Sequence, residues 1–159
     1  IIAKRHFSVL EHSSVTFAIS GVSRSFTHEL VRHRHLSFSQ LSQRYVDESK
    51  AELVLPPGSV AEEEAWLEEL HVRSLEVYRA IFDSRTARGA KKKEARQAAR
   101  AALLNAVETR IVVSGNIRAW REVIEKRHTP QADAEFYLVA GEILELIRLK
   151  APNSVADLT

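Results

Sequence analysis

The 159-residue sequence contains neither cysteine nor methionine. Without cysteine the chain cannot form a disulfide, cannot bind a metal through a thiolate and cannot use a cysteine as its nucleophile. The initiator methionine is absent too, and the sequence begins in the middle of a patterned segment, at Ile1-Ile2-Ala3. We therefore expect an N-terminal segment of the protein to be missing from this sequence.

Long hydrophobic runs are absent as well. No apolar segment approaches the roughly 18 residues that a membrane helix needs, and nothing resembles a signal peptide. The 23 basic and 21 acidic residues leave a formal charge of only +2, which gives no reason to expect nucleic acid or an anionic membrane as a partner. We expect a soluble, cytoplasmic protein. With 45% apolar residues, this length predicts one domain over residues 1–159 with a buried core.

Two segments have the patterns of β-strands. Residues 15–22 alternate the apolar Val15, Phe17 and Ile19 with small or polar side chains, which is the period of a strand with one buried face. Residues 109–114 are rich in β-branched apolar side chains and predict a second buried strand. Residues 53–55 could add a short third strand, ended by Pro56.

The remaining periodic segments predict helices over residues 23–33, 59–82, 91–104, 116–127 and 131–149. Ser59 and Glu62 can form a capping box at the start of the second helix, and Asn116 can cap the fourth. The core positions expected in the second and last helices are Leu67, Leu70, Tyr78, Ile81, Leu138, Ile143, Leu146 and Ile147. The sequence thus predicts an α/β (α+β) fold, a small mixed sheet flanked by helices.

The segment from His28 to Tyr45 has an unusual density of groups that bind anions. It contains Arg32-His33-Arg34 and, seven residues later, Ser42. Arginine is a planar, permanently charged donor suited to phosphates, and the serines of this segment add hydroxyl groups. The basic tripeptide falls at the end of a predicted helix and continues into a loop, which can wrap around a ligand. The pattern indicates a nucleotide pocket rather than a solvated surface.

Arg32-His33-Arg34, seven residues and then Ser42 resembles the signature of the flavin-dependent thymidylate synthase family. The likeness continues as an ordered series from His6 to about Leu146, through Gln43-Arg44-Tyr45 and residues 95–100, 105–110 and 114–120. An exposed basic loop would explain the tripeptide alone but not the whole series. Beside the family, residues 83–93 look short.

The resemblance implies an enzyme, a FAD-dependent thymidylate synthase that methylates dUMP to dTMP. It implies methylenetetrahydrofolate as carbon donor, FAD reduced by NADPH as the source of the hydride, and a homotetramer with active sites built across subunits. Ordinary thymidylate synthases attack the uracil ring with a cysteine thiolate, which this chain lacks. The implied partners are dUMP, a folate and further copies of the chain, with neither nucleic acid nor a membrane.

Site residues follow from the resemblance, position by position. The positions implied to bind the cofactor are His6, Arg32, His33, Arg34, Gln40, Asn116, Arg118 and Glu122. The positions implied to bind the substrate are Glu29, Gln40, Leu41, Ser42, Gln43, Arg44, Arg100 and Arg127. The candidates for a catalytic role are Arg127 and Ser42. No metal site is expected, because the histidines lack metal-binding spacing.

Arg127 also has chemical support from its own position. It follows Trp120 and Ile124 on one helix face, and a charge on an apolar face must find an anion or a set of carbonyls. A guanidinium against the pyrimidine carbonyls would stabilise negative charge on the ring during addition. Ser42 has no adjacent general base in the sequence, so phosphate or loop binding fits it better than covalent attack.

Two other interpretations stay open. Seven basic residues and one acidic residue lie between Arg85 and Arg100, which by itself suggests a nucleic-acid-binding module. Arg96 and Arg100, four apart on one helix face, could instead hold a single anion. A flavoprotein oxidase or an inactive relative would keep the fold and the flavin without methylating dUMP. The sequence departs from the family's usual residues at Gln40, Leu104, Glu122 and Gln131, which affects flavin tuning and folate contacts most.

Overall fold

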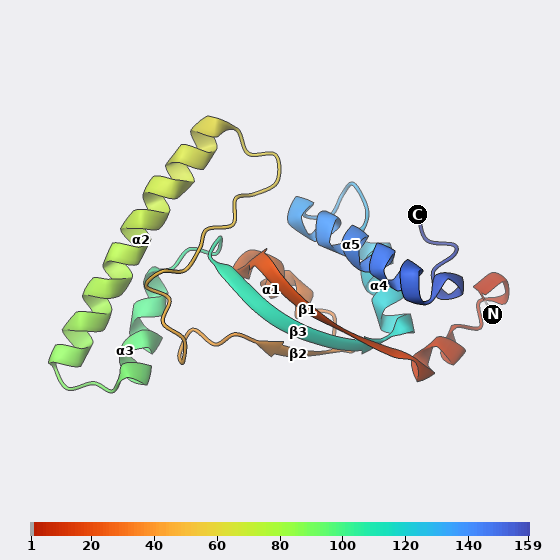
Figure 1. The fold of residues 1–159 in the computed structure, drawn as a ribbon, viewed down its shortest axis with the longest axis horizontal. Helices are drawn as coiled ribbons and strands as arrows, with labels where there is room; N and C mark the ends of the chain where they lie inside the picture. Colours follow the sequence, from red (N-terminus) through yellow and green to blue (C-terminus); the bar gives the residue numbers. More distant parts are fainter. Residues whose placement is uncertain (1) are drawn as a thin grey trace. The chain divides into compact units, whose positions relative to one another are not determined.

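The computed structural model of the chain describes residues 2–159, and Ile1 lies outside the described residues. The strands and α-helices (Figure 1) are, in chain order, β1 (Ser14–Ser23), α1 (Arg24–Leu30), β2 (Leu36–Gln40), α2 (Ala61–Ala87), α3 (Lys92–Ala99), β3 (Glu108–Asn116), α4 (Ile117–Arg127) and α5 (Ala134–Lys150). The 3-10 helices are η1 (Ile2–Lys4), η2 (Phe7–His12), η3 (Arg100–Ala102) and η4 (Pro152–Ser154). The predicted α/β fold class is confirmed.

The chain divides into two compact units. Unit 1 comprises Ile1–Ile19, His28–Ser39 and Val112–Thr159, and unit 2 comprises Ser20–Thr27 and Gln40–Ile111. The boundaries fall inside β1, β2 and β3, so each strand contributes residues to both units. No linker composition marks such boundaries, and the prediction of one domain came from the length and apolar content of the chain.

The strands form a sheet in the order β1-β3-β2. In unit 1, Thr16 Oγ1 and Ser114 Oγ are hydrogen-bonded at 2.8 Å. In unit 2, the backbone N–H of Gly21 donates to Glu108 Oε1 at 3.0 Å. Residue numbers therefore rise along β1 as they fall along β3, which makes this pair antiparallel.

The pairing of β2 with β3 is antiparallel too. Leu41, just after β2, donates its N–H to the carbonyl of Arg110 at 2.9 Å, whereas Leu36, at the start of β2, lies against Gly115 near the end of β3. The predicted mixed sheet is therefore wrong. β2 was missing from the prediction, although buried Leu36 and half-buried Phe38 alternate with exposed serines. The predicted strand at residues 53–55 is reduced to one bridge, from Leu53 to Val107.

Unit 1 has its core beneath α4 and α5. Trp120 is fully buried, donates its indole N–H to the Val15 carbonyl at 3.1 Å and packs edge-on against Phe17. Asn116 caps α4 as predicted, since its Oδ1 accepts from the N–H of Ala119 at 2.8 Å. In α5 the expected core positions Ile143 and Ile147 are confirmed, but Leu138 and Leu146 are exposed and Phe136, Ala140 and Leu144 are buried instead.

In unit 2, α2 packs against α3. The predicted capping box is shifted by one residue. The Glu63 carboxylate, rather than that of Glu62, accepts from the backbone N–H of Val60. The Ser59 hydroxyl donates to the Pro56 carbonyl. Tyr78 is buried as predicted, whereas Leu70 is 52% exposed.

Two buried hydroxyls tie α2 to neighbouring segments. Tyr78 Oη accepts from the N–H of Glu48, and Ser74 donates to the Ala102 carbonyl at 2.7 Å. The helix predicted over residues 91–104 ends early, at Ala99, so Arg100 opens η3 instead of continuing α3.

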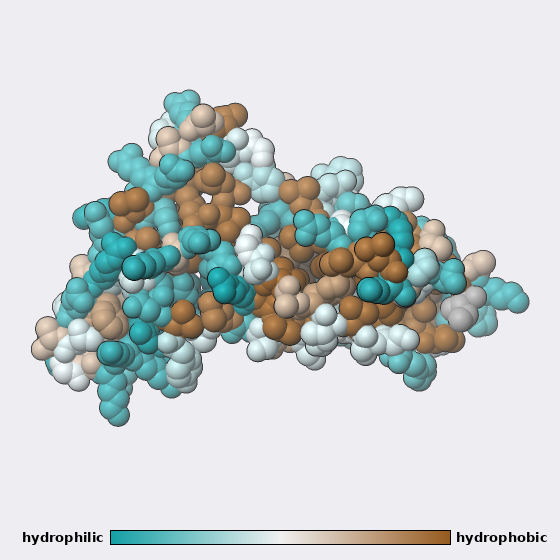
Figure 2. Space-filling model, viewed as in Figure 1, coloured by the Kyte–Doolittle hydropathy of each residue, from teal (hydrophilic) through white to brown (hydrophobic). Residues whose placement is uncertain are grey.

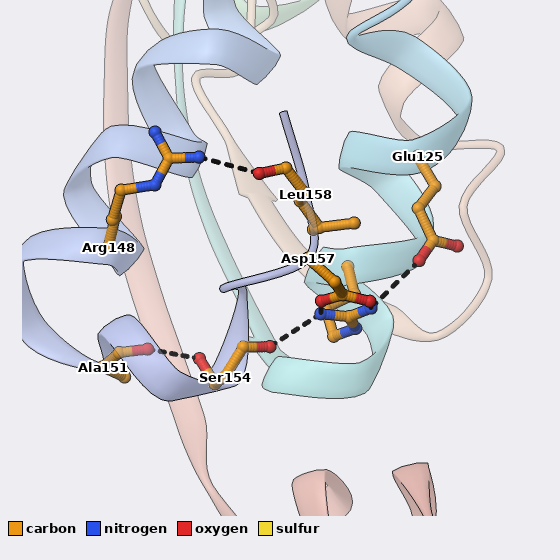
Figure 3. Close-up of polar contacts among 7 residues, drawn as sticks. Glu125, Arg148, Ala151, Ser154, Asp157 and Leu158 are labelled. Carbon is orange, nitrogen blue, oxygen red and sulfur yellow. Dashed lines mark hydrogen bonds and ion pairs between the residues drawn. The ribbon is translucent and has the colours of Figure 1, made fainter. Parts of the chain in front are cut away.

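A buried arginine holds the C-terminal segment of unit 1 (Figure 3). Arg121 is 3% exposed and makes two hydrogen bonds to the Asp157 carboxylate, at 2.7 and 2.8 Å. It also donates to the Ser154 carbonyl and to Glu125. The hydrogen bond from Arg121 lowers the pKa of Asp157. Most of the hydrogen bonds of the buried charge, those to Asp157 and Ser154, therefore depend on the C-terminal residues staying in place.

We expect Asp157→Asn to lower the free energy of unfolding by about 1 to 2 kcal/mol, because a buried guanidinium loses its charged partner but keeps the Ser154 carbonyl and Glu125. Urea denaturation measures this change. Since the folded pKa of Asp157 is lowered, its contribution to stability is full above the ordinary carboxyl pKa and is lost as the pH falls through the folded value. The free energies of unfolding of the two proteins should therefore become equal at acid pH.

The control is Glu145→Gln, which removes a surface pair with Arg148 and should change stability by under about 0.5 kcal/mol. Equal losses in both variants would contradict the role given to Asp157.

Candidate functional site

Arg127, the last residue of α4, is paired inside unit 1. Its Nη1 donates to Glu29 Oε2 at 2.6 Å, and its Nε donates to His33 Nε2 at 3.2 Å. The guanidinium carbon lies 4.7 Å from the centre of the Phe136 ring. These contacts confirm that an arginine on the apolar face of this helix finds an anion. They also join Arg127 to the His28–Tyr45 segment identified in the sequence.

His33 is held as a neutral ring. Because Arg127 donates to Nε2, that nitrogen accepts and carries no proton. Burial lowers the pKa of His33, and the positive charges of Arg127 and Lys126 lower it further. Glu29 and Glu122 oppose this effect more weakly. A proton on Nε2 would turn the hydrogen bond into a repulsion between two donors.

Two neighbouring cavities in unit 1 share the side chains of His35, Ala119 and Glu122. The first, of about 340 Å³, is lined by Arg32, His33, Arg34, His35, Leu36, Ala119, Glu122, Lys126 and Arg127. The second, of about 390 Å³, is lined by Glu11, His35, Asn116, Arg118, Ala119 and Glu122. Most of the side chains assigned to the cofactor thus line these two cavities.

Several of these side chains form ion pairs with other residues of the chain. Arg118 forms an ion pair with Glu11, and Glu122 forms one with Lys126. The hydrogen bond from Lys126 lowers the pKa of Glu122, which keeps a negative charge in a basic pocket. His6 is exposed in the turn before η2 and lines neither cavity.

Four of the residues of unit 2 assigned to the substrate, Leu41, Ser42, Gln43 and Arg44, lie in the loop after β2. Ser42 organises a turn there: its Oγ accepts from the N–H of Arg44 at 3.4 Å, and its carbonyl accepts from the N–H groups of Tyr45 and Val46. Within residues 2–159, no imidazole or carboxylate is hydrogen-bonded to the Ser42 hydroxyl. This geometry suits a binding loop, and it offers Ser42 no base for nucleophilic attack.

Gln40 faces the interior of unit 2, where its Nε2 donates to Thr27 Oγ1 at 2.8 Å and to Thr109 Oγ1 at 3.4 Å. Gln43 is buried, Leu41 is half-buried and Arg100 is exposed. These side chains all belong to unit 2, with Gln40 at the end of β2 and Arg100 at the start of η3.

Donors without partners mark this loop. Arg44 Nε and Arg96 Nε are buried and lack a hydrogen-bond partner among the described residues. Arg96 also donates from Nη1 to the Tyr45 carbonyl at 2.8 Å, and the Lys93 ammonium lies 4.6 Å from the centre of the Tyr45 ring. Unpaired buried donors on cations are costly, and a bound anion is one partner that would satisfy them; His71 Nδ1 on α2 lacks a partner among the described residues too.

Sequence reasoning missed Arg24, Glu48 and Lys126. Arg24 donates to the Leu41 carbonyl at 3.4 Å. Its pKa is lowered by burial and by Arg100, against the attraction of Glu48. Burial raises the pKa of Glu48. The position of Arg24 at a strand-to-helix junction could have singled it out; Glu48, an isolated acid in a polar loop, gave no signal.

Among residues 2–159, no group of three or more His, Asp or Glu side chains is placed so that it could hold a metal ion. No helix over the same residues is both long and apolar enough to cross a membrane.

The lowered pKa of His33 predicts a pH dependence of stability. Between the folded pKa and the ordinary value of about 6.5, the unfolded chain binds the proton and the folded chain does not, so the free energy of unfolding falls as the pH is lowered through this range. The His33→Gln variant should lose this part of the slope, measured by urea denaturation at several pH values. In Arg127→Gln, the His33 pKa measured by NMR titration should rise. A His33 pKa at or above its ordinary value in the unsubstituted protein would contradict the described contact.

The matching family model, described as thymidylate synthase complementing protein (Thy1), covers residues 1–153. The chain is 49% identical to a flavin-dependent thymidylate synthase of Mycobacterium marinum and 48% identical to that of Mycobacterium tuberculosis, each over 99% of this chain. It spans 66% of the length of these curated relatives.

The fold is also similar to a solved structure, the flavin-dependent thymidylate synthase ThyX of Helicobacter pylori complexed with FAD and dUMP. The TM-score is 0.74 and the identity 25%, over 98% of this chain and 78% of that one. With a family model matching nearly all its residues, the chain belongs to the Thy1 family, the flavin-dependent thymidylate synthases.

Proposed function

We propose that this chain converts dUMP to dTMP, with methylenetetrahydrofolate as carbon donor and FAD, reduced by NADPH, as reductant. The observation that carries the proposal is the cluster of Arg127, Glu29 and His33 beside a basic cavity. The curated relatives are named for this activity, and the Helicobacter pylori protein was crystallised with FAD and dUMP. The absence of cysteine agrees with a synthase that does not tether the nucleotide to a thiolate.

The two cavities of unit 1 suit FAD. A pyrophosphate is bound by arginine guanidinium groups, which can donate two parallel hydrogen bonds, and by backbone amides. Such guanidinium groups line the two cavities at Arg32, Arg34 and Arg118. Asn116 and His33 add neutral polar groups. When bound, reduced FAD supplies the hydride that completes the methyl group.

The Ser42 loop of unit 2 suits the phosphate of dUMP. The buried Nε groups of Arg44 and Arg96 need acceptors, and a phosphate dianion offers several. Burial lowers the pKa of Arg24, and the positive charge of Arg100 lowers it further; a bound anion would relieve the repulsion between the two arginines. Ser42 would then bind through its hydroxyl or hold the loop in shape. We assign it no covalent step.

Arg127 is the residue that would act on the pyrimidine. A guanidinium has five N–H donors, and the contacts to Glu29 and His33 use two of them. The remaining donors can meet ring carbonyl oxygens, where negative charge grows as carbon or hydride adds. Glu29 and Phe136 fix the orientation of the guanidinium beforehand, so little reorganisation is needed during the reaction. The family resemblance further supports a homotetramer.

The hydrogen source is tested by the folate product. With dUMP, methylenetetrahydrofolate, FAD and NADPH, we expect dTMP and tetrahydrofolate in about equal amounts, analysed by chromatography after anaerobic turnover. A conventional synthase takes the final hydrogen from the folate and releases dihydrofolate. Dihydrofolate formed in step with dTMP would overturn the mechanism. NADPH oxidation without dTMP would instead support a flavoprotein oxidase or an inactive relative.

For Arg127→Gln we expect kcat to fall on the order of 100-fold, the cost of losing a donor that stabilises developing charge. Steady-state rates at saturating dUMP measure it. The matched control is Arg110→Gln, which removes an exposed arginine whose neighbour Glu108 lies 3.6 Å away. A change in KM for dUMP with kcat preserved would show that Arg127 only binds the nucleotide.

A further inference from the structure

Two consecutive residues fasten the end of α4 to the start of α5. The guanidinium carbon of Arg127 lies 4.7 Å from the centre of the buried Phe136 ring. The next residue, His128, stacks on the next ring along α5, that of Tyr137. The centres of these two rings are 4.5 Å apart, and their planes are inclined by 18°. All four residues belong to unit 1.

A hydrogen bond gives the His128 ring one orientation. Its Nδ1 lies 3.1 Å from the carbonyl oxygen of Tyr137. Since a carbonyl can only accept, Nδ1 carries the proton and donates it. The backbone N–H of His128 donates to the Ile124 carbonyl at 2.8 Å, which closes the last turn of α4. His128 therefore joins the two helices, with its backbone bound to one and its side chain to the other.

Gly141 makes room for this ring. It lies one helical turn after Tyr137, on the same side of α5. A Cβ atom on residue 141 would lie 2.8 Å from Cε1 of His128, closer than packed carbon atoms come. Glycine is the least favourable residue for a helix interior apart from proline. Its place within α5 is explained by the imidazole that rests against the helix backbone.

Hydrophobic burial alone does not fix how α5 is rotated against its neighbours. The buried apolar residues of α5 are Phe136, Ala140, Ile143, Leu144 and Ile147. The exposed leucines of α5 are Leu138, Leu146 and Leu149. Figure 2 shows apolar side chains among hydrophilic ones over this helix. A helix that is apolar on more than one side can bury a similar area in several rotations, so contacts with a fixed direction select one of them.

We propose that His128 is a positioning residue for Arg127. By fastening the end of α4 to α5, it keeps the Arg127 guanidinium within reach of Glu29 and His33. Those two contacts, at 2.6 and 3.2 Å, are made by the tip of a long side chain whose backbone must stay in place. A displacement of about 1 Å at a reacting group can cost as much as 100-fold in rate. The consequence for dTMP formation rests on the proposed function, whereas the positioning itself does not.

The titration of His33 reports the position of Arg127 without any ligand. The Arg127 charge lowers the pKa of His33, in addition to the larger effect of burial. In His128→Ala we therefore expect the His33 pKa to rise, by part of the rise expected in Arg127→Gln. Gly141→Ala removes no titratable group but displaces the imidazole, and it should raise the His33 pKa too. NMR titration measures both, with the His33 signal assigned from the spectrum of His33→Gln.

The control is Asp157→Asn, which weakens the attachment of the C-terminal segment and alters none of these contacts. Its His33 pKa should equal that of the unsubstituted protein. If His128 only stabilises the fold, the His33 pKa will be unchanged in His128→Ala, and this result overturns the proposal. An equal rise in Asp157→Asn overturns it as well. Should His128→Ala fail to fold, an unchanged pKa in Gly141→Ala decides against the proposal instead, because alanine favours the helix.

Turnover separates this inference from the proposed function. At saturating dUMP, His128→Ala should lower kcat about tenfold, less than the loss expected for Arg127→Gln, while Asp157→Asn keeps the kcat of the unsubstituted protein. A raised His33 pKa with an unchanged kcat would support the positioning of Arg127 and count against its part in the reaction. A lowered kcat with an unchanged His33 pKa would overturn the positioning role of His128.

Discussion

The guanidinium of Arg127 must be paired, because it ends an α-helix whose same face carries fully buried Trp120 and Ile124. Glu29 and His33 provide the pairing: Glu29 lies in the last turn of α1, and His33 lies in the segment between α1 and β2. The position of Arg127 therefore fixes how the Arg32-His33-Arg34 segment lies against α4. Together with burial, which has the larger effect, Arg127 lowers the pKa of His33, and it adds positive charge to the neighbouring cavity. One ion pair thus links helix packing in unit 1 to the chemistry of the site.

The two clusters of candidate residues, one in each unit, differ in how their charges are paired. In unit 1, Glu29 pairs with Arg127, Glu122 with Lys126 and Glu11 with Arg118. In unit 2 the buried Nε atoms of Arg44 and Arg96 have no acceptor within the described residues. The ion pairs of unit 1 hold their arginine and lysine donors in fixed orientations. The unpaired arginine donors of unit 2 would be satisfied by a bound anion. This difference agrees with a cofactor cavity in unit 1 and a phosphate loop in unit 2.

Local patterns predicted most of the elements and the pairing of Arg127, but not the side chains that complete the site. The alternation at Val15, Phe17 and Ile19 and the cap at Asn116 depend on neighbouring residues, and both are confirmed. Glu48 comes close to Arg24 only through folding, so no spacing in the sequence reveals that these two charges interact. Leu70 has helical spacing but is exposed, because periodicity identifies an apolar face without saying what covers it. The antiparallel sheet likewise depends on long-range pairing.

The central claim is that flavin and dUMP meet at a site where Arg127 acts on the nucleotide. The most direct measurement is the absorbance spectrum of the FAD-loaded protein during titration with dUMP. We expect a saturable change in the flavin bands for the unsubstituted protein. In Arg127→Gln, FAD should still bind, but the response to dUMP should be weaker. A protein that retains no flavin, or whose bound flavin does not respond to saturating dUMP, would contradict the account.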